Sequence, residues 1–303
     1  MKLLVSALEP SSNLHLKEVL KHSHNVEIMG IFSQSLGTPL YDISEISIMG
    51  LVDAIKKYRW FLNIANEMVD LAKDADKILL MDSSGFNLPL AKKLKQRYPE
   101  KEIIYYILPQ VWASRKKRVK KLEKYCDKLL GILPFEVDYY SQGKAQYVGH
   151  PLLDEMDLTA AHQPEETIAF MPGSRKSEIK RLLPVFKSLR NKFPEKKALL
   201  IVPSTFSKEK INILYGDVSM FELSSNTHDA LSKAEFAFIC SGTATLEAAL
   251  IGTPFTLAFI AKKLISLSEQ NYLVLSRWAW QTLFLHTTMA QRYTMSYCRR
   301  MLR

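Results

Sequence analysis

The sequence predicts an α/β protein made of two Rossmann-like, doubly wound domains that face a cleft, and three observations support this. Short apolar runs rich in β-branched residues alternate with helical patterns along most of the 303 residues, as in the βαβ units of a parallel sheet. A polar stretch at 151–165 separates two such series. Several of the predicted strands end in Gly- or Ser-containing turns that lead into a helix, where this fold class binds its ligands.

The first domain, residues 1–150, contains six strand-like runs, at 3–8, 26–32, 77–82, 102–108, 128–133 and 146–149. After the linker at 151–165, the second domain, 166–263, contains five more, at 167–171, 198–203, 219–223, 234–240 and 254–260. Such runs read as strands buried on both faces, with helices covering the sheet. We expect ligands at the carboxyl ends of these strands, in a cleft between the domains.

The cysteines and the N-terminus indicate a reducing, cytoplasmic setting. Cys126, Cys240 and Cys298 are odd in number and far apart, which argues against a disulfide framework and against a Cys-x-x-Cys metal pair. Residues 1–8 carry too short an apolar run for a signal peptide. We predict no metal and no cofactor.

One segment, 236–261, is long and apolar enough to cross a bilayer. Ser-Gly-Thr at 241–243 and Gly-Thr-Pro at 252–254 divide it, however, into pieces of the length of a buried strand or helix. We therefore predict strand, helix and strand rather than a membrane span.

The formal net charge is +10, which is compatible with nucleic acid, anionic lipid or a phosphorylated substrate. No RNA-binding aromatic signature or zinc-finger spacing accompanies the charge, so we expect no nucleic-acid partner. The basic runs are either solvated helix faces or a surface for an anionic membrane or a phosphorylated lipid. They lie at 56–59, 92–97, 115–124 and in the final forty residues.

A predicted helix pair at 44–72 carries more apolar residues than one narrow core stripe requires. Basic residues are mixed among them, at 56–59. The pattern suits a surface that binds a membrane interface or acyl chains, and it equally suits a wide buried face in a large domain.

The turn Pro-Gly-Ser-Arg at 172–175 joins the strand at 167–171 to a helix in which Ile179, Leu182, Leu183 and Phe186 recur at helical spacing. Gly173 and Ser174 would aim free backbone N–H groups at one point, and Arg175 adds a forked donor. An anion is the expected guest. In the simpler interpretation, Gly173 only ends the strand and Ser174 caps the helix.

A second turn of this kind follows the strand at 234–240. Ser241, Gly242 and Thr243 lead into a helix that begins near Ala244, and Glu247 lies one turn further on. The segment has neither a Walker loop nor G-x-G-x-x-G, so two such turns in one domain favour a nucleotide sugar over ATP or NAD. Glu247 could accept hydrogen bonds from sugar hydroxyls, or it could be an ordinary exposed glutamate.

In the first domain, Asp82 ends the strand at 77–82 and precedes a helix that begins near Phe86. A carboxylate there could take a proton from an acceptor hydroxyl, or it could be an ordinary N-cap or turn residue. Gln110, Trp112 and Arg115 follow the next strand at the same edge. His150 begins the interdomain linker, where we expect a hydrogen-bonded hinge residue.

Seven motifs in order resemble those of the bacterial lipid-A-disaccharide synthases, from residue 1 to about 263. They are IMGLVDAI, LLMDSSGFN, LPQVWASRKKRVKKL, GILPFE, VGHPLLDEM, MPGSRKSEI and CSGTATLEAAL. The resemblance implies the glycosyltransferase B fold and a hexosyltransferase that is peripheral on the cytoplasmic face of the inner membrane. UDP-2,3-diacylglucosamine would donate its sugar to 2,3-diacylglucosamine 1-phosphate in lipid A biosynthesis, a step of lipopolysaccharide synthesis.

The resemblance also assigns roles to residues. Asp82 matches the family's essential aspartate, the general base for one inverting displacement. The two glycine turns match the UDP-binding elements, with Glu247 on the ribose. The remaining matches lie around the acceptor; they are Glu9, Ser11, Asn13, Asn87, Gln110 and Arg115.

The chain departs from the family pattern in three places. The family usually shows Gly-Glu-x-Ser-Gly-Asp where this chain has residues 8–13, and often Pro-Asp where it has Ser84-Gly85. The resemblance ends near Lys263, and residues 264–303 contain no Gly, Pro or Asp. We interpret this tail as a shifted reading frame or otherwise truncated end.

Two alternatives follow. The chain could be a truncated, inactive remnant that still binds UDP, or a UDP-sugar epimerase of the same fold. The oligomeric state is left open.

Overall fold

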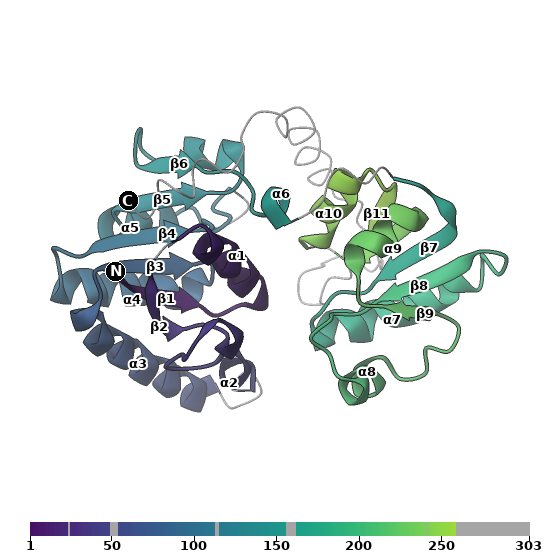
Figure 1. The fold of residues 1–303 in the computed structure, drawn as a ribbon, viewed down its shortest axis with the longest axis horizontal. Coiled ribbons are helices and arrows are strands. Elements are labelled where there is room, and N and C mark those ends of the chain that lie inside the picture. The colour runs from purple at the N-terminus through teal and green to yellow at the C-terminus, as the bar shows by residue number, and fades with distance from the viewer. Residues whose placement is uncertain (24, 49–53, 113–114, 156–161, 241, 259–303) are drawn as a thin grey trace, which may run out of the picture. The chain divides into compact units, whose positions relative to one another are not determined.

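The computed structural model describes all residues except 24, 49–53, 113–114, 156–161, 241 and 259–303. The chain forms two compact units, which divide between Glu155 and Met156. Each unit contains one parallel sheet with helices packed on both faces (Figure 1). The predicted α/β, doubly wound class is therefore confirmed. Residues 264–303, which we interpreted from the sequence as a shifted reading frame or otherwise truncated end, lie outside the described residues.

The sheet of the first unit has six strands in the order β2-β1-β3-β4-β5-β6. All neighbouring strands run parallel. The strands are β1 (Lys2–Ala7), β2 (Glu27–Ile31), β3 (Lys77–Met81), β4 (Glu102–Tyr106), β5 (Lys128–Gly131) and β6 (Ala145–Tyr147). The strand order reverses between β1 and β3, and in open α/β sheets the crevice for ligands lies at the carboxyl ends of the strands at such a point.

The helices of this unit cover the sheet on both sides. They are α1 (Pro10–Lys21), α2 (Ile43–Ile48), α3 (Ala54–Leu71), α4 (Ser84–Arg97), α5 (Arg118–Tyr125) and α6 (Leu152–Glu155), with 3-10 turns η1 (Gln34–Leu36), η3 (Ala72–Asp74) and η4 (Pro134–Tyr139). Side chains alternate along a strand, so Leu3 and Val5 of β1 join the core cluster that contains α1. Leu4 joins the cluster that contains α3, α4 and α5.

The second unit has five parallel strands in the order β11-β10-β7-β8-β9. The strands are β7 (Glu165–Met171), β8 (Lys197–Ile201), β9 (Glu222–Ser224), β10 (Ala234–Cys240) and β11 (Phe255–Ala258). The helices are α7 (Lys176–Arg190), α8 (Lys208–Tyr215), α9 (Thr227–Lys233) and α10 (Ala244–Ile251). One core cluster packs under α7 and α8 and the other under α9 and α10. As predicted, Ile179, Leu182, Leu183 and Phe186 of α7 are buried.

All eleven predicted strands are present, with small shifts at their ends. The strand expected at 219–223 begins later, at Glu222, because Met220 is exposed and the chain reaches the edge of the sheet only after it. The segment at 236–258 forms strand, helix and strand, as predicted. Among the described residues, no helix combines the length and the apolar character needed to span a bilayer.

Candidate functional site

The turn between β3 and α4 carries Asp82 in an unusual backbone conformation. Asp82 and Ser83 have φ values of 48° and 33°, in the left-handed region that non-glycine residues rarely adopt. Such residues cost about 1–3 kcal/mol each and persist only where the surroundings hold them, often at functional sites. The N-cap of α4 is Ser83, so the interpretation of Asp82 as the capping residue is wrong.

Two buried side chains donate hydrogen bonds to the main chain of this turn. Asn87, which is fully buried, donates to the carbonyl oxygens of Met81 at 2.9 Å and Asp82 at 3.1 Å. Its Oδ1 accepts a 2.6 Å hydrogen bond from the Ser6 hydroxyl of β1. The Tyr105 hydroxyl of β4 also donates to the Asp82 carbonyl, and burial raises the pKa of Tyr105 well above its usual range. Tyr105 therefore remains a neutral donor, and neighbouring strands fix the turn.

The loop after β1 lies against the same turn. Glu9 is the N-cap residue of α1, and its Oε1 lies 3.5 Å from Ser83 Oγ. Asn13 is buried; its amide donates to the carbonyls of Ala7 and Glu9, each at 2.8 Å, and accepts from the Ser33 N–H at 2.6 Å. Asn13, like Asn87, thus holds main chain in place, while Glu9 and Ser11 are partly exposed. The structure brings Glu9 and Asp82 to adjoining loops.

The segment after β4 contributes a third loop to this region. Gln110 and Arg115 are exposed, and Arg115 has a φ of 59°. Arg118, at the start of α5, donates from Nη1 to Ser84 Oγ at 2.6 Å, which ties this loop to the first residue of α4. Arg118 and Tyr105 were not singled out from the sequence, because their partners lie 34 and 23 residues away.

Trp112 packs inward rather than standing free for a substrate. Its ring meets the Phe135 ring edge-on at 5.5 Å. Its side chain also interacts with Glu136, a buried carboxyl that accepts from the N–H groups of Ile132 and Leu133, both at 3.1 Å. Burial raises the pKa of Glu136 to about 7. Glu136 therefore connects the loop after β4 with the loop after β5.

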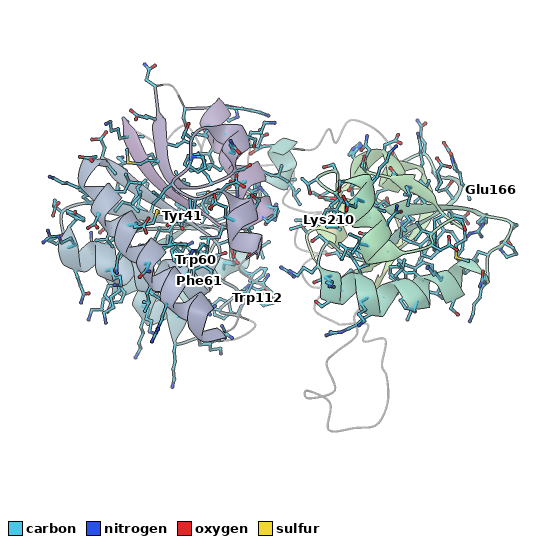
Figure 2. All side chains as sticks on the ribbon, turned by 90° about the horizontal axis from the view of Figure 1, so that it is seen from below. Tyr41, Trp60, Phe61, Trp112, Glu166 and Lys210 are labelled. Atoms are coloured by element: carbon cyan, nitrogen blue, oxygen red, sulfur yellow. The ribbon has the colours of Figure 1, made fainter. Side chains whose placement is uncertain are left out.

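An aromatic row extends from α3 to the first turn of α4. The ring centroids of Tyr41 and Trp60 are 5.9 Å apart, those of Trp60 and Phe61 5.1 Å, and those of Phe61 and Phe86 5.5 Å. Figure 2 shows the first three side by side on the first unit. They pack partly buried against the core, so this part of the predicted helix pair forms a wide, half-buried face.

At the linker, His150 is buried, and its Nδ1 accepts from the Leu152 N–H at 3.2 Å. The ring meets that of His15 edge-on at 6.5 Å. His150 is thus a hydrogen-bonded residue where the chain leaves the first unit, as predicted.

In the second unit, the turn from β7 to α7 has the conformation expected of a glycine turn. Gly173 has a φ of 93°, and a Cβ there would lie 2.6 Å from Glu178 Oε2. The N-cap of α7 is Arg175 and not Ser174, so the simpler interpretation of this turn is wrong in that detail. Ser174 and Arg175 are exposed.

Glu178 occupies the position beside the Gly173 turn that we predicted for an anion. Its Oε2 accepts from the Arg175 N–H at 3.3 Å, and its Oε1 accepts from Arg175 Nη1 at 3.0 Å. The Arg175 side chain is 73% exposed, so this pair contributes under about 1 kcal/mol and can open readily. The turn is already adapted to hold a carboxylate or another anion.

The second glycine turn lies beside the first, because β10 and β7 are neighbouring parallel strands. Cys240, the last residue of β10, has its Sγ 3.2 Å from where a Cβ on Gly173 would lie. Ser241 is outside the described residues; Gly242 and Thr243 are exposed, and Ala244 and Glu247 are partly exposed. Both turns therefore present main-chain groups at one edge of this sheet. Among the described residues, no group of three His, Cys, Asp or Glu side chains could hold a metal ion.

Comparison with known proteins identifies relatives of this chain. The family model described as lipid-A-disaccharide synthetase matches residues 3–270. The chain is 55% identical over 267 residues to the lipid-A-disaccharide synthase of Helicobacter pylori strain J99, covering 86% of this chain and 73% of the relative. It is 47% identical to that of Campylobacter jejuni strain RM1221, covering 86% and 76%.

Solved structures with the same fold include two UDP-GlcNAc 2-epimerases. The enzyme from Neisseria meningitidis matches with a TM-score of 0.56 at 13% identity, over 85% of this chain and 82% of that one. The enzyme from Methanocaldococcus jannaschii matches with a TM-score of 0.58 at 10% identity, over 100% and 99%. At such identities the likeness shows the fold alone, so it does not favour epimerase activity.

Proposed function

The chain belongs to the lipid-A-disaccharide synthase family, a family of hexosyltransferases, and on this premise we propose both its substrates and its mechanism. The donor is UDP-2,3-diacylglucosamine and the acceptor is 2,3-diacylglucosamine 1-phosphate. The products are the β-1,6-linked disaccharide 1-phosphate and UDP. The observation that carries the residue assignment is the strained turn at Asp82, which Asn87 and Tyr105 brace from neighbouring strands.

In this mechanism Asp82 is the general base. Its carboxylate takes the proton of the acceptor 6-hydroxyl while that oxygen attacks the anomeric carbon of the donor. The bond from the anomeric carbon to the diphosphate oxygen breaks, and its electron pair leaves with UDP. A single displacement inverts the anomeric centre, and Asp82 afterwards releases its proton to solvent. Glu9, whose Oε1 lies 3.5 Å from Ser83 Oγ, would help to orient the acceptor.

The two glycine turns of the second unit would hold the donor. Negative charge grows on the diphosphate as the bond breaks, and fixed N–H dipoles with a guanidinium stabilise such charge without reorganising. The donor phosphate would replace Glu178 as the partner of Arg175, which is possible because that ion pair is solvent-exposed. Glu247, in the first turn of α10, would accept hydrogen bonds from the ribose.

We further propose that the enzyme works at the cytoplasmic face of the inner membrane as a peripheral protein. Both substrates carry acyl chains, and the half-buried row of Tyr41, Trp60, Phe61 and Phe86 leads to the first turn of α4. Aromatic side chains suit the boundary between water and lipid.

The experiment is to incubate the purified full chain with both acylated sugars and to measure disaccharide 1-phosphate and UDP. Equal amounts of both products support the proposal. A folded protein that binds UDP but forms no disaccharide is the truncated remnant instead. Conversion of the UDP-sugar into an isomer without acceptor would identify an epimerase.

A further inference from the structure

The loop after β4 and the start of α5 border an open pocket of about 500 Å3, and all five of its lining residues are basic. The lining residues are Arg115, Lys116, Lys117, Arg118 and Lys121. Lys117, the N-cap residue of α5, and Lys121 are four residues apart, a spacing at which like charges repel each other. Five cations around one open pocket therefore favour the binding of an anion.

Carboxylates do not neutralise these cations within the part of the chain that the structure describes. None of the salt bridges found there includes any of the five residues. The one hydrogen bond that a pocket side chain makes to another side chain there runs from Arg118 to the neutral Ser84 hydroxyl. Unpaired positive charge in a hollow is suited to a compact, highly charged anion.

The pocket is directly connected to the turn that carries Asp82. Arg118 lines the pocket and also donates to Ser84 at 2.6 Å, and Ser84 follows Asp82 by two residues. Consecutive Cα atoms are about 3.8 Å apart, so Asp82 and Ser84 are near neighbours in space. One side-chain hydrogen bond and two residues of main chain thus connect the pocket with Asp82.

We propose that this pocket binds the phosphate monoester of the acceptor sugar. In 2,3-diacylglucosamine 1-phosphate, the 1-phosphate and the 6-hydroxymethyl group are attached to C1 and C5, the two carbons on either side of the ring oxygen. A phosphate held by Lys117, Arg118 and Lys121 would therefore keep the 6-hydroxyl within one sugar ring of these cations, where it can face Asp82. This assignment rests on the proposed acceptor, and it gives the enzyme a reason to prefer a phosphorylated sugar over the same sugar without phosphate.

The test compares binding of two acceptors to the full chain, both dispersed in a neutral detergent: 2,3-diacylglucosamine 1-phosphate and 2,3-diacylglucosamine. Lys117→Ala/Lys121→Ala removes two charges from the pocket. Lys120→Ala/Lys124→Ala removes two exposed charges from the same helix outside the pocket and serves as the matched control. Lys117 is the N-cap residue of α5 but makes no capping hydrogen bond with its side chain, and alanine favours helix at the other three positions, so we expect α5 to form in both variants. Binding to phosphatidylglycerol vesicles is measured in parallel.

We expect the parent chain to bind the phosphorylated acceptor at least about tenfold more tightly, because a hydrogen bond to a charged group contributes roughly that factor. The pocket variant should lose most of this preference while binding the unphosphorylated acceptor normally, and the control should keep it. The proposal is overturned if the pocket variant and the control keep the same preference for the phosphorylated acceptor, or if both lose it equally. A pocket variant that loses only vesicle binding also overturns it, since the pocket would then be a membrane contact.

This test is independent of turnover. A parent chain that shows the phosphate preference but forms no disaccharide would contradict the proposed function and leave the pocket assignment standing.

Discussion

Replacing Asn87 with alanine should both destabilise the first unit and impair catalysis, because Asn87 connects β1, β3 and the start of α4. Its side chain makes three hydrogen bonds in a fully buried position: one from Ser6 and two to the carbonyls of Met81 and Asp82. Alanine removes all three and leaves the Ser6 hydroxyl buried without this partner. The turn that carries Asp82 also loses a support for its left-handed conformation.

The size of the effect follows from these bonds. Each contributes about 1 kcal/mol net, and a buried polar group left unsatisfied costs more, so we expect a loss of about 3–4 kcal/mol. For a unit of this size, each kcal/mol lowers Tm by roughly 2–4 °C. In addition, kcat should fall by a larger factor than the affinity for UDP, because the predicted UDP site lies in the second unit.

The loss in the free energy of unfolding is measured by urea denaturation of the full chain, monitored by tyrosine and tryptophan fluorescence. The matched control is Asn66→Ala, which removes an exposed amide whose Oδ1 accepts from Lys93 at 2.8 Å and should cost under about 0.5 kcal/mol. If the free energy of unfolding of Asn87→Ala is within about 1 kcal/mol of that of the parent chain, and the variant keeps its activity, the role assigned to Asn87 is wrong.

Three further predictions concern other parts of the structure. The pKa of Glu136 is about 7 in the folded chain, against the ordinary value of 4.5. Between pH 4.5 and 7 the native state therefore binds more protons than the unfolded state, and the free energy of unfolding should fall by about 3 kcal/mol as the pH rises through this range. Glu136→Gln should abolish this pH dependence in unfolding curves measured at several pH values. Arg175→Ala should weaken UDP binding about tenfold or more in calorimetry, with under about 1 kcal/mol lost from stability; unchanged affinity would refute its role. Gly173→Ala should also weaken UDP binding, since its Cβ would meet Glu178 at 2.6 Å, whereas Gly216→Ala, with a φ of 61° and open space around it, should cost stability only.

The fold could be predicted from the sequence because its signals are local. Buried parallel strands read as short apolar runs, and the helices between them show a 3.6-residue period. Even the edge strand β9 was misplaced by only three residues at its start, since its pattern is diluted by exposed positions such as Met220 and Leu223.

The bracing of the site could not be predicted, because it depends on contacts between distant residues. Asn87 meets Ser6 across 81 residues, and nothing local distinguishes a buried asparagine from one that contacts substrate. Likewise, the left-handed conformation of Asp82 has no sequence signal in Met-Asp-Ser-Ser, and Arg175 rather than Ser174 caps α7.

The roles of Asp82 in unit one and of the glycine turns in unit two stay predictions until substrates are tested. The most direct measurement is the kcat for disaccharide 1-phosphate formation by Asp82→Asn beside Asp70→Asn, an exposed aspartate on α3. Our account predicts a fall of at least about 100-fold for Asp82→Asn, the usual contribution of a general base, with UDP affinity unchanged and Asp70→Asn fully active. An Asp82→Asn enzyme that keeps the parent kcat would contradict the account.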